Sequence, residues 1–325
     1  MNSQERPLEG RIALVAGATR GAGRGIAVAL GELGATVICT GRSGQGRRDP
    51  GLEGAEAAPG ARSPFALEGR PETIEESAAL VDAAGGRGIA RRVDHTDEAQ
   101  VAALAAEVGA EHGRLDILVN DIWGGDALVD WERAPWDQPI DKGRLMLDRG
   151  LMSHVITCRH AIPLLKRSDR GLIVEITDGD SMAWRGSLFY DLTKTAVIRL
   201  AFGLSEALRE DGIAAVALTP GFLRSEVLLD FFEVDDATWR EAADPHFAFS
   251  ESPRFVGRAL AALAADPDLM ARSGKTLSSW GLARDYGLVD LDGQRPDWGV
   301  HAAQEPFGQD QRQSHARFLD SFGQD

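Results

Sequence analysis

Between residues 11 and 219 the chain alternates short apolar runs with longer stretches of helical period. The apolar runs predict strands at 12–16, 36–40, 88–93, 115–119, 172–176 and 214–218, with a short seventh strand at 275–278. The stretches between them predict helices at 23–33, 71–84, 97–112, 142–166 and 188–210. Such alternation is typical of parallel β-α-β units. We therefore predict an α/β fold with a doubly wound parallel sheet of about seven strands and helices on both faces. A ligand is expected at the carboxyl ends of the strands.

Composition and charge narrow the class of protein. The chain has 325 residues, 43% hydrophobic and 26% charged, which is ordinary for a globular protein. A formal net charge of -15 would repel nucleic-acid phosphates and anionic lipid. Residues 1–11 lack a signal-peptide apolar segment, and no uninterrupted apolar run reaches about 18 residues. We expect a cytoplasmic protein without nucleic-acid or membrane partners.

The cysteines and histidines do not predict a metal site. Cys39 and Cys158 are the only cysteines, and both lie in apolar stretches, which favours buried reduced thiols. The seven histidines lack zinc-type spacing.

A glycine-rich turn follows the first predicted strand and leads directly into a helix. Glycines at this point allow a tight turn and close approach of the backbone to a pyrophosphate, whose charge would face the helix N-terminus. A purely structural turn is the alternative. The predicted dinucleotide-binding residues of the turn are Gly17, Thr19, Arg20, Gly21, Ala22 and Gly23.

The end of the second strand bears on the choice of cofactor. Residues 40–43 read Thr-Gly-Arg-Ser and offer no carboxylate for a ribose 2'-hydroxyl. Arg42, together with Arg20 in the turn, offers guanidinium groups suited to a 2'-phosphate. This favours NADP(H) over NAD(H), unless both arginines are merely solvated.

Tyr190 and Lys194 lie four residues apart at the start of a predicted helix, and therefore on one of its faces. The chain has only two tyrosines. An ammonium group and an oxidised nicotinamide both favour phenolate, so the pKa of Tyr190 can fall toward neutral pH, as a general acid-base requires. An ordinary solvent-exposed pair is the alternative.

Taken together, these motifs resemble those of the short-chain dehydrogenase/reductase (SDR) family, over about residues 8–292. The resemblance implies a single Rossmann-like domain at 1–295 and a homodimer or homotetramer built on the helices at 142–166 and 188–210. It also implies that Asp94 and His95 border the adenine and that Asn120 steadies the cofactor region. The residues that would line the nicotinamide carboxamide are Pro220, Gly221 and Ser225. Residues 282–288, with Asp290 and Asp292, also resemble a branch that contains dehydrogenase/reductase family member one.

The sequence departs from the family pattern at three places. Asp178 holds the position of the family's catalytic serine. The helix asparagine that supports a relay water aligns with Gly150, so its role is vacant or taken by Asp148 or His154. The usual Asn-Asn-Ala-Gly after the fourth strand reads Asn-Asp-Ile-Trp at 120–123.

A carboxylate at position 178 would repel the oxyanion that develops when a carbonyl is reduced. Asp178 must therefore be protonated, turned away or facing a cation, or it caps a turn. If it stays ionised, a protonated imine suits the site better than a ketone. Thr177 or Ser181 could instead supply the missing hydroxyl.

Three segments do not follow the regular alternation. Residues 43–70 predict a flexible surface insertion or a flap near the adenosine, and residues 222–250 predict an amphipathic lid over the substrate. Residues 296–325 predict a polar tail or an oligomer contact. A bulky hydrophobic substrate is expected, and the candidate pocket residues are Trp123, His154, Trp184 and Phe222.

The sequence therefore supports three hypotheses about function. The first is an NADP(H)-dependent oxidoreductase that acts on a carbonyl/alcohol pair, with Tyr190 as acid-base, Lys194 lowering its pKa and Asp178 tuning substrate polarity. The second is an imine or iminium reductase that uses Asp178. The third is a non-catalytic protein that senses NADP(H).

Overall fold

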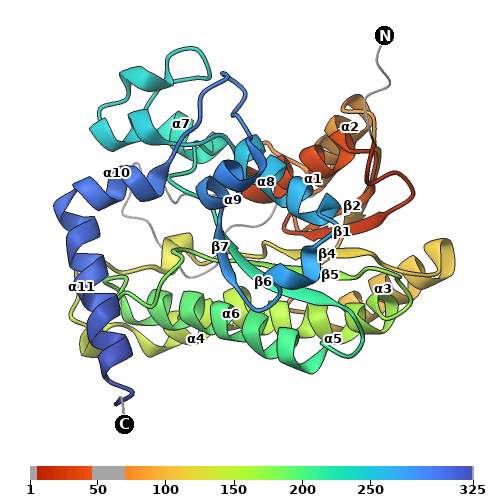
Figure 1. The fold of residues 1–325 in the computed structure, drawn as a ribbon, viewed down its shortest axis with the longest axis horizontal. Coiled ribbons are helices and arrows are strands. Elements are labelled where there is room, and N and C mark those ends of the chain that lie inside the picture. The colour runs from red at the N-terminus through yellow and green to blue at the C-terminus, as the bar shows by residue number, and fades with distance from the viewer. Residues whose placement is uncertain (1–5, 46–69, 324–325) are drawn as a thin grey trace.

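Seven parallel strands form one sheet between two layers of helices in the computed structural model, which describes residues 6–45 and 70–323 (Figure 1). The strands are β1 (Ile12–Ala16), β2 (Thr36–Gly41), β3 (Arg87–Arg92), β4 (Ile117–Asn120), β5 (Leu172–Ile176), β6 (Ala214–Thr219) and β7 (Thr276–Ser278). Residues 46–69, most of the predicted insertion, lie outside the described residues.

The strand order is β3-β2-β1-β4-β5-β6-β7, and all neighbours are parallel. The chain winds outward from β1 in one direction and from β4 in the other, so the topological switch lies between these two strands. Ligands of open α/β sheets bind at the carboxyl ends of the strands beside such a switch. The predicted doubly wound fold is confirmed, including its seventh strand.

Helices cover both faces of the sheet (Figure 1). One layer comprises α1 (Gly21–Glu32), α2 (Ile74–Ala83), α8 (Pro253–Ala265) and α9 (Ser279–Tyr286). The other comprises α3 (Glu98–His112), α4 (Ile140–Leu147), α5 (Ser153–Leu165) and α6 (Leu188–Ala207). Alternate residues of β1 serve the two layers: Ala13 and Val15 pack in the core with α1 and α8, and Ile12 and Leu14 pack in the core with α3 and α5.

The predicted helix at 142–166 is interrupted. A π-helical turn at Asp148–Met152 separates α4 from α5, and Gly150 lies at its centre. Single π-turns inside α-helices often accompany functional sites.

The segment after β6 and the C-terminal segment lie side by side (Figure 1). Residues 222–250 contain α7 (Glu226–Phe231) and two 3-10 turns, Trp239–Glu241 and Pro245–Phe249. Where the sequence predicts a polar tail, the structure has α10 (Trp298–Gln304) and α11 (Pro306–Asp320). Phe222 contacts Trp298 edge to face, with ring centroids 5.6 Å apart.

Other short 3-10 turns are Asp126–Leu128, Pro135–Asp137 and Leu269–Arg272. None of the helices within residues 6–45 and 70–323 is long and apolar enough to span a membrane.

Candidate active site

A cavity of about 430 Å³ lies at the carboxyl ends of the strands and collects most of the predicted site residues. It extends from the glycine turn, past the end of β2, to the start of α6. The predicted residues in its wall are Gly17, Thr19, Arg20, Gly21, Ala22, Arg42, Asp94, His95, Trp123, Asp178, Tyr190, Lys194, Pro220 and Ser225.

The glycine turn has the geometry that a bound phosphate needs. Gly17 has φ +95, and a Cβ there would lie 2.3 Å from the Asp121 carbonyl oxygen. A Cβ on Gly23 would lie 2.3 Å from the Gly17 carbonyl oxygen. The Gly21 N–H donates to a carboxylate oxygen of Glu226, 2.8 Å away. A carboxylate thus already takes an anion position at the N-terminus of α1, so the turn suits the negatively charged pyrophosphate of a dinucleotide.

The two arginines differ in their surroundings. The Arg20 Nε lies 3.3 Å from a carboxylate oxygen of buried Glu72. Arg42 lines the cavity beyond β2, and a Cβ on Gly124 would lie 3.4 Å from its guanidinium. Arg20 therefore carries a carboxylate partner at the point where the sequence analysis expects a phosphate.

Asp94 and His95, predicted to border the adenine, both line the first cavity. The two ring nitrogens of His95 lie 2.8 Å from the hydroxyls of Thr40 and Thr157. Burial lowers the pKa of His95 to about 3, so its ring is neutral. Asp94 accepts hydrogen bonds from the N–H and the hydroxyl of Thr96.

Asn120 and His154 lie behind the cavity wall and outside its lining. The Asn120 amide donates to one oxygen of buried Glu175 at 2.8 Å, and the His154 Nδ1 lies 2.6 Å from the other. The His154 Nε2 lies 2.9 Å from the Ile122 carbonyl oxygen. The structure therefore makes His154 part of a buried polar network and does not place it in a substrate pocket.

Tyr190, the third residue of α6, faces Asp178. Its hydroxyl donates to the Asp178 Oδ2 at 2.9 Å. Edge contacts with Trp123 and Trp131 hold its ring, with centroids 5.6 and 5.2 Å apart. Burial and the adjacent Asp178 carboxylate raise the pKa of Tyr190 well above its ordinary value. The chain's own groups therefore oppose the lowering that the sequence analysis expects.

Lys194 lies one helical turn after Tyr190 and is covered by an indole ring. Its Nζ is 4.0 Å from the Trp123 ring centroid and 5.7 Å from that of Tyr190. Burial lowers the pKa of Lys194 even though the negative charges of Asp178 and Asp126 act to raise it. The Trp123 Nε1 donates to Asp126 at 2.6 Å, which fixes the ring.

A second cavity of about 670 Å³ shares Asp178, Pro220 and Leu223 with the first. Its wall includes the predicted residues Gly221 and Phe222 and much of the C-terminal segment. The C-terminal lining residues are Trp298, Gly299, Ala302, Ala303, Phe307, Gly308, Gln311, Arg312 and His315. Trp184, predicted as a pocket residue, lines neither cavity and is 43% exposed.

Sequence reasoning gave no role to several acidic residues in or beside the first cavity. Burial raises the pKa of Asp121 to about 7, and the Gly23 N–H donates to its carboxyl group. Asp126 in the cavity wall and Glu226 beside the glycine turn are the other acidic residues without a predicted role. Asp121 could have been noticed because it directly follows β4, where the chain departs from the family pattern.

Comparison with known proteins decides the family. A family model described as short chain dehydrogenase matches residues 54–234. Dehydrogenase/reductase SDR family member 1 of Mus musculus is 31% identical over 294 residues, which are 89% of this chain and 85% of that protein. The chain belongs to the short-chain dehydrogenase/reductase family. This SDR protein is an NAD(P)-dependent oxidoreductase, and it resembles the branch of family member 1.

Other similarities are more distant. A 3-oxoacyl-[acyl-carrier-protein] reductase of Staphylococcus aureus is 29% identical over 66% of this SDR chain and 75% of its own length. A solved short-chain dehydrogenase of Mycobacterium thermoresistibile has a TM-score of 0.68 at 23% identity and covers 90% of this chain and 92% of its own. A 7α-hydroxysteroid dehydrogenase, solved with NADH and 7-oxo glycochenodeoxycholic acid, has a TM-score of 0.63 at 20% identity. The match covers 91% of this chain and 98% of that one. The two solved structures support the fold.

The departure of this SDR chain from the family pattern at Gly150 now has a structural account. Gly150, aligned with the family's relay asparagine, lies in the π-turn, and a Cβ there would lie 2.6 Å from the Trp123 ring. The indole that covers Lys194 therefore fills the space that a side chain at position 150 would need.

The candidate replacements for the family serine are also distinguishable. The Thr177 hydroxyl donates to the Lys194 carbonyl oxygen at 2.9 Å, within the protein. Ser181 accepts from the Ala183 N–H at 3.4 Å. Asp178 is the one of the three whose side chain contacts Tyr190.

Proposed function

We propose that the protein is an NADP(H)-dependent oxidoreductase that acts on the carbonyl/alcohol pair of a hydrophobic organic substrate. Tyr190 would be the acid-base and Lys194 the cation that adjusts its pKa. The observation that carries the proposal is that Tyr190 and Lys194 line the same cavity as the glycine turn. Binding of the dinucleotide along this cavity would bring its reactive end toward Tyr190. The nicotinamide, when bound, would supply or accept the hydride.

Within this proposal the chain's own residues have distinct tasks. Gly21 would bind the pyrophosphate at the N-terminus of α1, and Pro220 and Ser225 would position the nicotinamide end. A raised pKa keeps the Tyr190 hydroxyl protonated at neutral pH, ready to donate a proton to a carbonyl oxygen. Oxidation would require Lys194 to stabilise the phenolate.

Our proposal for the cofactor rests on Arg42. Residues 42–45, which follow β2, include no carboxylate, and Arg42 lines the cavity there. A guanidinium can bind a 2'-phosphate through two parallel hydrogen bonds. Fluorescence titration should show tighter binding of NADPH than of NADH, and Arg42→Gln should remove most of that difference. A clear preference for NADH would overturn the assignment.

Reduction of an iminium substrate is a second candidate, favoured by the position of Asp178. Its carboxylate accepts a hydrogen bond from the Tyr190 hydroxyl, with the two oxygens 2.9 Å apart. Arg185 donates to the backbone oxygen of Asp178, and its ion pair is with Asp191. A cationic carbon–nitrogen double bond would be stabilised beside the Asp178 carboxylate, whereas a developing oxyanion would be repelled.

Panels of ketones and cyclic imines with NADPH, tested on the wild type and Asp178→Ser, would separate the two candidates. If the native substrate is a carbonyl, the wild type should reduce ketones. If Asp178→Ser improves ketone reduction and abolishes imine reduction, the carbonyl assignment is wrong.

We also propose a homodimer or homotetramer that uses α5 and α6. Apolar side chains are exposed on these helices, among them Val155 (37%), Leu192 (47%) and Phe202 (42%). Light scattering would test the assembly, and a monomer would contradict it. The cytoplasmic location stays a prediction.

A further inference from the structure

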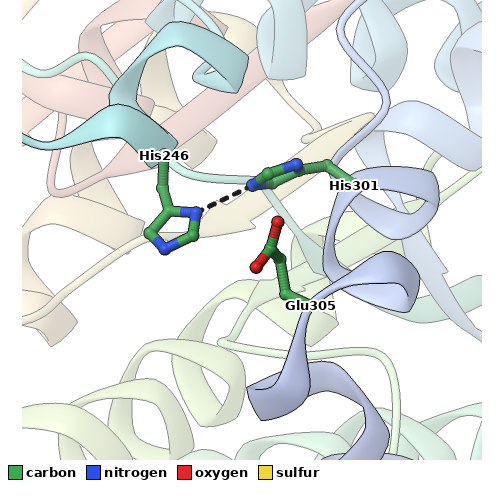
Figure 2. A group of neighbouring side chains, drawn as sticks. All are labelled: His246, His301 and Glu305. Carbon is green, nitrogen blue, oxygen red and sulfur yellow. Dashed lines mark hydrogen bonds between the residues drawn. The ribbon is translucent and has the colours of Figure 1, made fainter.

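Two histidines and a glutamate meet where the 222–250 segment contacts the C-terminal helices (Figure 2). His246 lies in the 3-10 turn Pro245–Phe249 and His301 in α10, and Glu305 is the residue that joins α10 to α11. Each offers one ligand atom, and all three atoms lie within 4.8 Å of one another. The His246 Nδ1 is 3.0 Å from the His301 Nε2.

Aromatic neighbours hold the two imidazoles in place. The Phe249 ring stacks on His301, with centroids 3.8 Å apart and planes 7° apart. Phe307 contacts His246 edge to face at 5.5 Å, and Trp298 lies 5.3 Å from His301. Rings fixed by packing lose little conformational entropy when they bind a ligand.

The spacing of the ligand atoms suits one metal ion. Two nitrogens that bind an ion at about 2.1 Å lie about 3.0–3.4 Å from each other, depending on the coordination geometry. The two imidazole nitrogens already have this separation, and the Glu305 carboxylate would need only a small movement to join them. Two imidazoles and one carboxylate suit Zn²⁺ and its transition-metal neighbours better than Mg²⁺ or Ca²⁺.

The two imidazoles of the cluster also contact each other, and one of them is buried. His301 is 7% exposed. In the absence of an ion, one proton between the two nitrogens accounts for the hydrogen bond drawn in Figure 2.

We propose that His246, His301 and Glu305 bind one Zn²⁺-class ion, which joins the 222–250 segment to the C-terminal helices beside the second cavity. His246 lines that cavity, so the fourth coordination position can face it. The histidine spacing predicts no metal site, because His246 and His301 are 55 residues apart and only His301 and Glu305 have a short spacing.

Zinc titration of the chelator-treated full chain tests the proposal. Calorimetry should show one Zn²⁺ per chain, and Co²⁺ should give the visible absorption of a nitrogen- and oxygen-ligated ion. His246→Gln and Glu305→Gln should each weaken Zn²⁺ binding at least about tenfold. The control is His160→Gln, a histidine on α5 that pairs with Glu98, and it should leave binding unchanged.

Melting temperature provides a second readout that does not depend on catalysis. Zn²⁺ should raise the melting temperature of the wild type and of His160→Gln, and should have little effect on His246→Gln. His301 is buried, so the two more exposed ligands carry the test if His301→Gln does not fold. Two results would overturn the proposal. One is a wild type that does not bind Zn²⁺ saturably. The other is Zn²⁺ binding by His246→Gln and Glu305→Gln that equals that of the wild type.

Discussion

Asp178→Asn removes a negative charge beside the Tyr190 hydroxyl while preserving the shape of the side chain. Ionised Tyr190 would place a phenolate against the Asp178 carboxylate, 2.9 Å from its Oδ2. Two unit charges at that separation repel by about 1.4 kcal/mol in water and about 6 kcal/mol at an effective dielectric constant of about 20. Because the Asp178 side chain is exposed, we expect an effect near the lower figure. The pKa of Tyr190 should fall by about one to two units, at about 1.36 kcal/mol per unit.

The assay uses the scarcity of tyrosine in this chain. Of its two tyrosines, Tyr286 can be changed to phenylalanine, so that the near-ultraviolet absorbance of tyrosinate reports Tyr190 alone. Circular dichroism on the same samples marks the pH at which the fold is lost. In the Tyr286→Phe protein, adding Asp178→Asn should make Tyr190 ionise at a pH at least about one unit lower. Asp180→Asn, a change to an exposed carboxylate two residues away, is the matched control. An unchanged or higher pKa of Tyr190 in Asp178→Asn would refute the reasoning.

Three further predictions concern packing, the cofactor turn and pH. Gly150→Ala should lower the free energy of unfolding by about 1–3 kcal/mol by overpacking, whereas Gly203→Ala, whose Cβ would meet nothing within 4 Å, should not. Chemical denaturation compares them, and equal stabilities would contradict the packing argument. Glu226→Gln should bind NADPH about three- to tenfold more tightly, because the competing anion at the Gly21 N–H is gone. Weaker binding in a fluorescence titration would count against this. Burial raises the pKa of Glu251 from 4.5 to about 8, so its contribution to stability is full below about pH 4.5 and is lost as pH rises through about 8. Glu251→Gln should therefore gain stability over the wild type between about pH 5 and about pH 8.5 in urea denaturation, and a constant difference would contradict this.

The sheet could be predicted from sequence because its strands are buried on both faces. Every residue of β1 and β5 is buried. β1 therefore reads as an unbroken apolar run, and β5 as an apolar run interrupted only by Glu175. The glycine turn and the Tyr190–Lys194 pair were predictable for a related reason, since each depends on local backbone geometry within a few residues.

The C-terminal helices could not be predicted in this way. Gly308 is the one buried residue of α11, so hydrophobic periodicity carries little signal. The helix is held instead by Ser314 and His315, which accept hydrogen bonds from the N–H groups of Trp184 and Met182. These contacts join residues 130 and 133 positions apart and leave no local pattern.

Side-chain orientation set the limit of prediction within the site. The sequence placed Asp178, Trp123 and His154 near one another but could not say where each side chain points. Asp178 faces the Tyr190 hydroxyl, Trp123 covers Lys194, and His154 turns to Glu175 behind the wall. Each orientation depends on tertiary partners, so the electrostatics of Tyr190 emerged only with the fold.

The turnover of Tyr190→Phe is the most direct test of the central claim that this phenol transfers the proton. With saturating NADPH and the best substrate from the panels, kcat should fall about 10²-fold or more, while NADPH affinity stays within about threefold. Tyr286→Phe, which removes the other phenol, should retain full activity. A Tyr190→Phe enzyme that turns over within about threefold of the wild type would contradict the account.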